Sequence, residues 1–135
     1  MDCIFCNIIK GKIAARKITE TEKSLAFLDA FPLTKGHTLV IPKNHYMKIQ
    51  EMSIDDSIDL FETVRVLTNN IEQLFSTCLI AIHNGKESGQ EVPHVHVHII
   101  PRSSDDGASS VHSVFRKRPE LTNAELDQIA EKLHG

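Results

Sequence analysis

The sequence lacks the features of a membrane protein, of a general nucleic-acid-binding protein and of a disulfide-stabilised secreted protein. No apolar run approaches the roughly 20 residues that a membrane-spanning helix needs, and the first residues contain no apolar signal-peptide core. Lys and Arg number 15 against 18 Asp and Glu, so no basic excess points to nucleic acid. Three cysteines are too few for a disulfide framework and better suited to metal binding or packing. We therefore expect a cytoplasmic protein with neither a membrane nor a nucleic acid as partner.

Periodic apolar patterns divide the 135 residues, enough for one domain with a substantial core, into short strands and three helices. Strands are predicted at 17–20, 24–29, 37–41 and 78–82. Ser53 is a suitable N-cap for one long helix, whose apolar stripe has steps of three and four residues. That stripe consists of Ile54, Ile58, Phe61, Val64, Leu67, Ile71 and Leu74. Short helices are predicted at 3–11 and after a capping box formed by Thr122 and Glu125.

Residues 93–102, Pro-His-Val-His-Val-His-Ile-Ile-Pro-Arg, carry a histidine at every second position between β-branched residues. Such alternation predicts a β-strand, with His94, His96 and His98 in a row on one face and the β-branched residues on the other. A strand face of three imidazoles is costly to bury unless something polar meets it. The row therefore indicates a metal, an anionic substrate, or both.

A zinc site is the first use that these imidazoles could have. A CxxC pair alone is equally compatible with half a zinc site, a redox pair or two small core residues. Structural zinc needs four nitrogen or sulfur ligands in a tetrahedron, and two histidines could complete the set that the cysteines begin. The candidate ligands are Cys3, Cys6, His45 and His94.

Catalysis is the second use, and the two can be reconciled. His96 and His98 lie further along the predicted strand and would stay free for a substrate, with His37 as a neighbour. A neutral imidazole is a competent nucleophile toward phosphorus and would pass through a covalent intermediate. A hydrolytic metal site that uses all three strand histidines is the alternative. It is disfavoured because residues i and i+4 of a strand lie about 13 Å apart at the backbone.

The segment from His94 to Ile99 resembles the HxHxHxx signature of the histidine triad (HIT) nucleotide-binding proteins. The segments at 3–6, 36–45 and 89–92 resemble other parts of that family, so the likeness covers about residues 3 to 102. It implies an α+β fold: an antiparallel sheet of about five strands, one long helix packed on it, and short terminal helices. It also implies a homodimer. Residues 1–102 would be the HIT domain, and residues 103–135 an extension with a terminal helix, within the same single domain.

The resemblance implies an enzyme that hydrolyses or transfers a nucleoside monophosphate, typically AMP. The substrate would be a phosphoramidate, a dinucleoside polyphosphate or a related conjugate. His96 matches the nucleophile that becomes nucleotidylated, with its ring oriented by the backbone carbonyl of His94. His98 matches a contact to the phosphate and leaving group, and His37 a fourth histidine near the active site. The alternative is a purine nucleotide-binding or sensing module with little or no turnover.

Other positions match the family's nucleotide and zinc sites. Asp29 matches the carboxylate that holds the ribose hydroxyls. Positions near the base and sugar are matched by Phe5, Ile8 and Leu28. Many members that have an N-terminal CxxC bind structural Zn²⁺ through residues that match Cys3, Cys6, His45 and His94, the same tetrad that ligand chemistry indicates.

The loop before the histidines departs from the family's pattern at two positions. His83, with Asn84 next to it, stands where relatives carry Asn or Gln in contact with sugar or phosphate, and either could make this contact. Gln90 belongs to a family-like segment, whereas Glu91 stands where relatives often have Ser or Thr to help the leaving group depart. A carboxylate there could accept or donate a hydrogen bond but would repel an anionic leaving group such as a second nucleotide.

Overall fold

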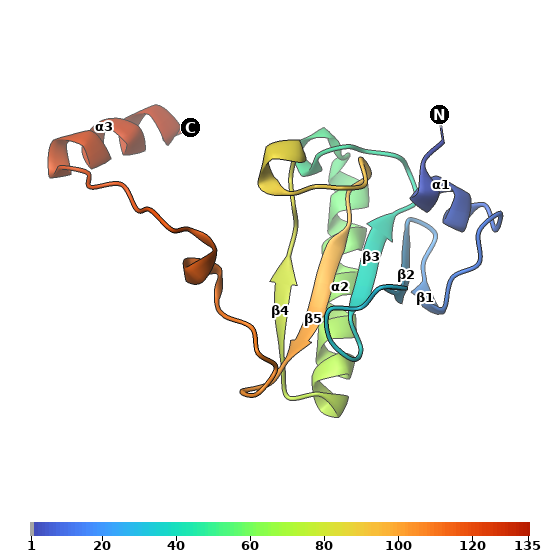
Figure 1. The fold of residues 1–135 in the computed structure, drawn as a ribbon. Coiled ribbons are helices and arrows are strands. Elements are labelled where there is room, and N and C mark those ends of the chain that lie inside the picture. Colours follow the sequence, from blue (N-terminus) through green and yellow to red (C-terminus); the bar gives the residue numbers. More distant parts are fainter. Residues whose placement is uncertain (1) are drawn as a thin grey trace.

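The structure, a computed structural model, describes residues 2–135 and contains one five-stranded antiparallel sheet. The strands are β1 (Lys17–Glu20), β2 (Ser24–Leu28), β3 (Thr38–Pro42), β4 (Thr77–Ala81) and β5 (Val97–Arg102). Their order across the sheet is β1-β2-β3-β5-β4, with every neighbouring pair antiparallel (Figure 1). The predicted α+β class and five-stranded sheet are confirmed.

The helices are α1 (Ile4–Ile9), α2 (Ile54–Leu74) and α3 (Asn123–Leu133), accompanied by the short 3-10 turns η1 (Ile49–Glu51), η2 (Lys86–Ser88) and η3 (Val111–Val114). Ser53 caps α2 as predicted, because its hydroxyl accepts the backbone N–H of Asp56 at 3.1 Å. Thr122 and Glu125 form the predicted capping box of α3. Within residues 2–135, no helix is both long and apolar enough to cross a membrane.

Helix α2 packs on one face of the sheet through Leu60, Val64, Leu67 and Ile71 (Figure 1). The predicted stripe is only partly confirmed. Its remaining members are exposed: Ile54, Ile58, Phe61 and Leu74. Apolar residues of α2 cover two adjacent flanks of the helix, and a single sheet face can bury only one of them.

The opposite face of the sheet carries α1. Phe5 and Ile8 of this helix join a second apolar cluster with residues of β2 and β3, namely Leu25, Phe27, Leu39 and Ile41. The sheet therefore lies between α2 on one side and α1 with its neighbouring loops on the other (Figure 1).

The histidine segment is only half strand, which corrects the prediction that residues 93–102 form one strand. Strand β5 begins at Val97, so His98 is its one histidine. Upstream, the backbone N–H of Val95 donates to the Tyr46 carbonyl at 2.7 Å instead of joining the ladder. The predicted division of faces holds, because the β-branched residues Val95, Val97 and Ile99 are buried in the cluster beneath α2.

Residues 103–135, called the arm below, project away from the sheet and carry α3 at their far end (Figure 1). Apart from the half-buried Asp106, every residue of the arm is exposed. Asp106 accepts from Arg102 Nε at 2.6 Å, which closes the turn where the arm leaves β5.

Candidate active site and metal centre

A cavity of about 550 Å³ opens on the α1 side of the sheet. Its volume falls within the range of small-molecule sites. Nine residues predicted from the sequence line it: Phe5, Ile8, Leu28, Asp29, His37, His83, Glu91, His96 and His98. One part of the lining is apolar, and another is made of imidazoles and carboxylates.

The backbone fixes which nitrogen of His96 carries the proton. His96 Nδ1 lies 2.7 Å from the His94 carbonyl oxygen, which can only accept, so Nδ1 carries the hydrogen and Nε2 keeps its lone pair. Burial lowers the pKa of His96 below its usual value, against the effect of that hydrogen bond, so the ring is neutral at pH 7. The Phe5 ring packs edge-on against it with centroids 5.1 Å apart. A neutral imidazole held in this tautomer is suited to nucleophilic attack.

A second chain of hydrogen bonds fixes His98 in the other tautomer, with its hydrogen on Nε2 instead of Nδ1. The Leu33 backbone N–H donates to His37 Nδ1 at 3.1 Å, so the hydrogen of His37 lies on Nε2. That Nε2–H faces His98 Nδ1 at 2.9 Å, which leaves the hydrogen of His98 on its own Nε2.

His98 Nε2 is buried and has no hydrogen-bond partner among the described residues. Burial, followed by the neighbouring histidines, lowers the pKa of His98 to about 4, so the ring donates as a neutral N–H. Buried donors are nearly always paired in folded proteins. Because His98 lines the cavity, this donor is available to an anionic ligand.

Asp29 lies beside these rings at the end of β2. The Phe31 backbone N–H donates to its Oδ1 at 2.9 Å, while Oδ2 lies 3.6 Å from His37 Nε2. Asp29, His37 and His98 bring three ligand atoms within 4.8 Å of one another. The tautomers argue against a metal here, because His37 accepts at Nδ1 and carries its hydrogen on Nε2, leaving that ring no free lone pair.

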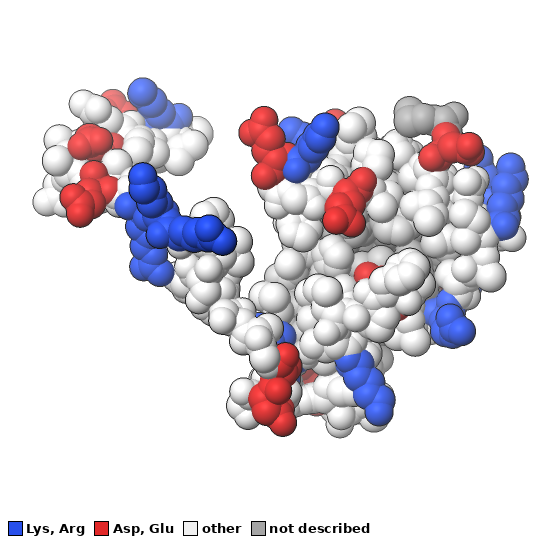
Figure 2. Space-filling model, viewed as in Figure 1, with Lys and Arg blue, Asp and Glu red and all other residues white. Residues whose placement is uncertain are grey.

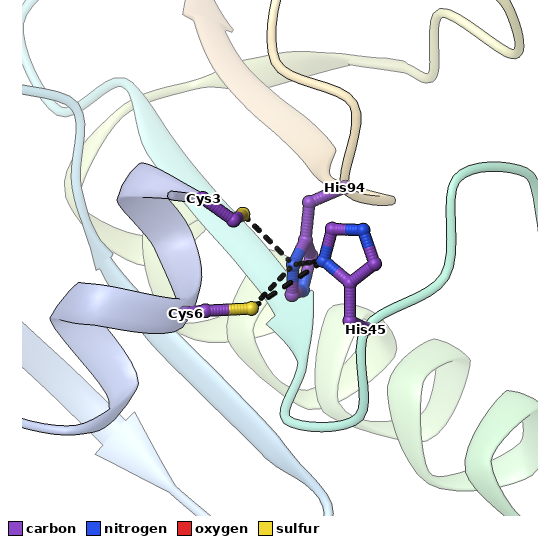
Figure 3. Close-up of side chains that lie close together, drawn as sticks. All are labelled: Cys3, Cys6, His45 and His94. Carbon is purple, nitrogen blue, oxygen red and sulfur yellow. Dashed lines mark hydrogen bonds between the residues drawn. The ribbon is translucent and has the colours of Figure 1, made fainter. Parts of the chain in front are cut away.

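A separate cluster gathers Cys3, Cys6, His45 and His94, whose ligand atoms also lie within 4.8 Å of one another (Figure 3). His94 Nε2 donates to the Pro42 carbonyl at 2.8 Å, which leaves the lone pair of Nδ1 directed into the cluster. Burial lowers the pKa of His94 to about 4, in keeping with a neutral ligand.

The separations within this cluster match a tetrahedron of metal ligands. His94 Nδ1 lies 3.1 Å from His45 Nδ1, 3.5 Å from Cys3 Sγ and 3.7 Å from Cys6 Sγ, and Cys6 Sγ lies 3.4 Å from His45 Nδ1. Zinc bonds of about 2.0–2.1 Å to nitrogen and about 2.3 Å to sulfur place tetrahedral ligands roughly 3.3–3.8 Å apart. The four side chains can therefore hold a metal ion with little rearrangement.

The cluster and the cavity share structure. His94 contributes its ring to the cluster and its carbonyl to the orientation of His96. Phe5 lies on α1 between the two cysteines, and its ring packs edge-on against His94 at 5.8 Å and against His96 at 5.1 Å. Any metal held by the cysteines would also hold Phe5 against the imidazole of His96.

Two predicted residues, Asn84 and Gln90, do not line the cavity. Asn84 accepts from the Ile49 N–H at 2.9 Å and donates to Gln50 Oε1 at 3.0 Å. Gln90 accepts from the Gly85 N–H at 2.8 Å and donates to the Met47 carbonyl at 2.9 Å. Both side chains therefore hold the loop at 84–90 against residues 47–50 through hydrogen bonds.

His83, by contrast, lines the cavity, and its ring lies 5.6 Å from that of His98. Gly89 lies against this ring with φ +110°, a left-handed conformation that side chains rarely adopt. A Cβ at this position would lie 3.1 Å from His83 Cδ2. The glycine therefore permits the loop to close over the histidine that replaces the family's amide.

Sequence reasoning missed several contributors to the site, and three of them show why. Leu33 acts through a backbone N–H, which leaves no signature in the sequence. Leu39 belongs to a buried strand and reads as core. Arg16 is the only cationic side chain among the described residues that line the cavity, and no motif surrounds it. On the face drawn in Figure 2, charges of both signs are scattered over the body, and basic side chains stand together on the arm, where the sequence has Arg116-Lys117-Arg118.

Known proteins resemble this chain over nearly its whole length. A HIT domain family model matches residues 10–105. An uncharacterized HIT-like protein of Methanocaldococcus jannaschii is 42% identical over 134 residues, which cover 98% of this chain and 99% of that protein. The adenosine 5'-monophosphoramidase of Schizosaccharomyces pombe is 39% identical over 134 residues, with the same two coverages.

Solved structures agree with these matches. The crystal structure of a HIT family member from Bacillus subtilis superposes with a TM-score of 0.87 at 34% identity, covering 98% of this chain and 95% of that one. A Zn-bound histidine triad family protein from Mycobacterium smegmatis superposes with a TM-score of 0.75 at 32% identity, covering 98% of both chains.

Proposed function

This chain belongs to the HIT domain family, and on that premise we propose that it is a nucleotide hydrolase that releases AMP from a conjugate, with His96 as nucleophile. The observation that carries the proposal is the tautomer of His96. Its Nδ1–H donates to the His94 carbonyl, which leaves the lone pair on Nε2, and the residue lines the cavity. The relative in Schizosaccharomyces pombe, named for adenosine 5'-monophosphoramidase activity, supports a phosphoramidate as the conjugate.

The reaction proceeds in two displacements at phosphorus. His96 Nε2 attacks the α-phosphorus, and a phosphorus–nitrogen bond to the imidazole forms as the bond to the leaving amine breaks. The amine departs neutral with that electron pair, because its nitrogen takes up a proton from solvent before cleavage. Water then attacks the phosphorus, the bond to Nε2 breaks, AMP leaves, and the proton of the water passes to solvent. Meanwhile His98 Nε2–H donates to the phosphoryl oxygen on which charge builds.

The rest of the cavity positions the nucleoside. Asp29 would accept hydrogen bonds from the ribose hydroxyls, since within residues 2–135 its Oδ2 has no closer partner than His37 Nε2 at 3.6 Å. Phe5, Ile8 and Leu28 form the apolar part of the lining, which suits a base and sugar. Of the predicted loop contacts, His83 and Glu91 remain, because Asn84 and Gln90 brace the loop itself.

We infer that Cys3, Cys6, His45 and His94 hold a structural zinc ion. The tetrahedral separations support zinc, as does the Zn-bound relative from Mycobacterium smegmatis. The ion would cross-link α1 to the segment that carries the nucleophile. The site needs both thiols reduced, which favours the cytoplasm as the compartment.

We also infer a homodimer that forms through the free edge of β4. Within residues 2–135, β4 pairs only with β5, so its outer edge is open to a further strand. Glu72 of α2 accepts the Cys78 N–H at 3.0 Å, which places that flank of the helix beside β4. Exposed apolar side chains line this region, here called the β4–α2 edge: Ile54, Ile58, Phe61, Leu79 and Ile80. A second copy would bury these side chains and extend the sheet.

Brief incubation with adenosine 5'-phosphoramidate, followed by intact-mass analysis without acid, tests the proposed chemistry. We expect an AMP adduct on the wild type that is absent from His96→Ala. His134→Ala, which removes an exposed histidine outside the cavity, is the matched control and keeps the adduct.

Absence of both adduct and turnover across several nucleotide conjugates would overturn the hydrolase. Tight AMP binding in that case would identify a nucleotide-binding or sensing module instead. All the histidines that the reaction needs are present and held in useful tautomers, which favours the enzyme.

A further inference from the structure

Asp56 is a buried carboxylate in the first turn of α2, on the sheet face opposite the cavity. Its neighbour Asp55 is exposed, as suits an acidic residue that only complements the helix dipole. Burying a carboxylate is costly unless hydrogen bonds compensate it. Asp56 has this compensation, because its Oδ2 accepts the Tyr46 hydroxyl at 2.6 Å and the Asn44 amide at 2.8 Å. These two bonds hold the pKa of Asp56 below its usual value, so the group is an ionised acceptor.

Through these bonds Asp56 holds both neighbours of His45. Strand β3 ends at Pro42, before the segment 44–46 begins. The ring of His94 donates from Nε2 to the Pro42 carbonyl, as metal-binding histidines usually do with their second nitrogen. Nε2 of His45, in contrast, is buried and has no hydrogen-bond partner among residues 2–135. The orientation of the His45 ring therefore depends on its own backbone, which the two bonds to Asp56 fix.

Tyr46 also links this segment to the nucleophile. Its carbonyl accepts the Val95 N–H at 2.7 Å, at a point where the ladder between β3 and β5 has ended. Val95 lies between His96 and His94, whose carbonyl fixes the His96 tautomer. A continuous series of contacts thus leads from the start of α2 through Tyr46 to the ring that would attack phosphorus.

We propose that Asp56 is a positioning residue of the active site, which holds segment 44–46 and, through it, the backbone at 94–96. The proposal rests on the proposed function, since its effect on catalysis requires that His96 attacks phosphorus. Asp56 is not among the described residues that line the cavity, so it acts through the histidines and touches no substrate. Small displacements are costly, because a shift of about 1 Å in a reacting group can lower the rate about 10²-fold.

Asp59, almost one turn further along α2, provides a matched control. Its Oδ1 accepts the Thr21 hydroxyl at 2.8 Å and the Ser24 hydroxyl at 2.5 Å, so it holds the turn between β1 and β2. We expect Asp56→Ala and Asp59→Ala to lower Tm alike, by about 5–10 °C, because each removes the acceptor of two hydrogen bonds. Neither Thr21 nor Ser24 lines the cavity, so purely structural roles would give both variants the same activity.

Cleavage of adenosine 5'-phosphoramidate, measured on full-length zinc-loaded protein well below either Tm, separates the two carboxylates. Asp56→Ala should lower kcat about 10²-fold and keep KM within about threefold, whereas Asp59→Ala should keep both within about twofold. Asp56→Asn retains an oxygen acceptor and should restore kcat to within about fivefold of the wild type. Tyr46→Phe removes only the hydroxyl and should lower kcat about tenfold, a result that decides the matter even if Asp56→Ala does not fold.

Two readouts need no turnover. Competition with a chelator should show zinc binding weakened about tenfold in Asp56→Ala and unchanged in Asp59→Ala. In ¹⁵N NMR of the histidine rings, His96 should show only the Nδ1–H tautomer in the wild type and in Asp59→Ala, and both tautomers in Asp56→Ala.

The outcomes separate this role from the proposed chemistry. Equal kcat, equal zinc affinity and the same His96 tautomer in Asp56→Ala and Asp59→Ala would overturn the positioning role and leave the hydrolase standing. Absence of turnover in the wild type would overturn the hydrolase and, with it, the effect of Asp56 on catalysis. Zinc affinity and the His96 tautomer would in that case still decide whether Asp56 positions the histidines.

Discussion

We predict that removing the buried donor of His98 changes stability and activity in opposite directions. His98→Met replaces the ring with an apolar side chain of similar length and removes the Nε2–H that has no partner among the described residues. It also removes the acceptor for His37 Nε2–H, but Asp29 Oδ2 lies only 3.6 Å from that donor and can take over with a small shift. The substitution thus removes one unsatisfied group without leaving another.

The expected magnitudes follow from these contacts. An unsatisfied buried donor costs about 1–3 kcal/mol, which His98→Met should recover in part, so the free energy of unfolding should stay unchanged or rise by up to about 2 kcal/mol. Most substitutions of buried side chains lower it by about 1 kcal/mol. Loss of a single donor to a developing oxyanion lowers kcat by about 10²–10³-fold.

Denaturant unfolding and single-turnover cleavage of adenosine 5'-phosphoramidate measure the two quantities on zinc-loaded protein. His98→Gln is the matched control, because its amide can place an N–H near the former Nε2. It should keep kcat within about tenfold of the wild type and gain no stability. The reasoning fails if His98→Met lowers the free energy of unfolding by more than about 2 kcal/mol, or if its kcat stays within about threefold of the wild type.

Three further predictions concern the metal, pH and the leaving group. Metal analysis of wild-type protein purified without chelator should find about one zinc per chain, and less than about one-tenth zinc per chain would count against the tetrad. Cys6→Ser should release the zinc and lower Tm by about 10 °C. The lowered pKa of His98, about 4, means that the unfolded chain binds an extra proton below about pH 6.5. Stability is therefore complete above about pH 6.5 and falls by on the order of 1–3 kcal/mol toward pH 4, and thermal unfolding should show a smaller fall in His98→Gln. Glu91→Ser should raise kcat/KM for a dinucleoside polyphosphate about 2–10-fold relative to adenosine 5'-phosphoramidate, and equal changes for both substrates would refute a charge effect.

Local spacing in the sequence was enough to predict which side chains meet at the candidate metal centre. Cys3 and Cys6 share one end of α1, and the ends of β3 and β5 bring His45 and His94 to the same region, as expected from two neighbouring strands. The alternation after Pro93 correctly separated the histidines from the β-branched residues that pack under α2. These features depend on the period of a strand or helix, which the sequence encodes directly.

Features that depend on tertiary contacts could not be predicted in the same way. The apolar stripe of α2 was one continuous pattern in the sequence, yet the sheet covers Val64 and Leu67 and leaves Ile54 and Ile58 exposed. Asn84 has the right chemistry for a sugar contact, but the turn at 49–50 takes up its hydrogen bonds. Which flank of a helix or which end of a loop remains free is decided by neighbours distant in sequence.

The histidines of the site illustrate how the backbone differentiates identical side chains. All are imidazoles with the same usual pKa, and burial keeps His94, His96 and His98 neutral alike. What distinguishes them is the backbone group or ring that each one meets: a carbonyl on Nε2 of His94, a carbonyl on Nδ1 of His96, and the His37 N–H on Nδ1 of His98. The first ring is left with a lone pair that the proposed zinc site would use, the second with a lone pair that the proposed attack on phosphorus would use, and the third with a donor that the proposed phosphate contact would use. Since a shift of one residue would exchange these partners, the alternating spacing and its placement against β3 are required together.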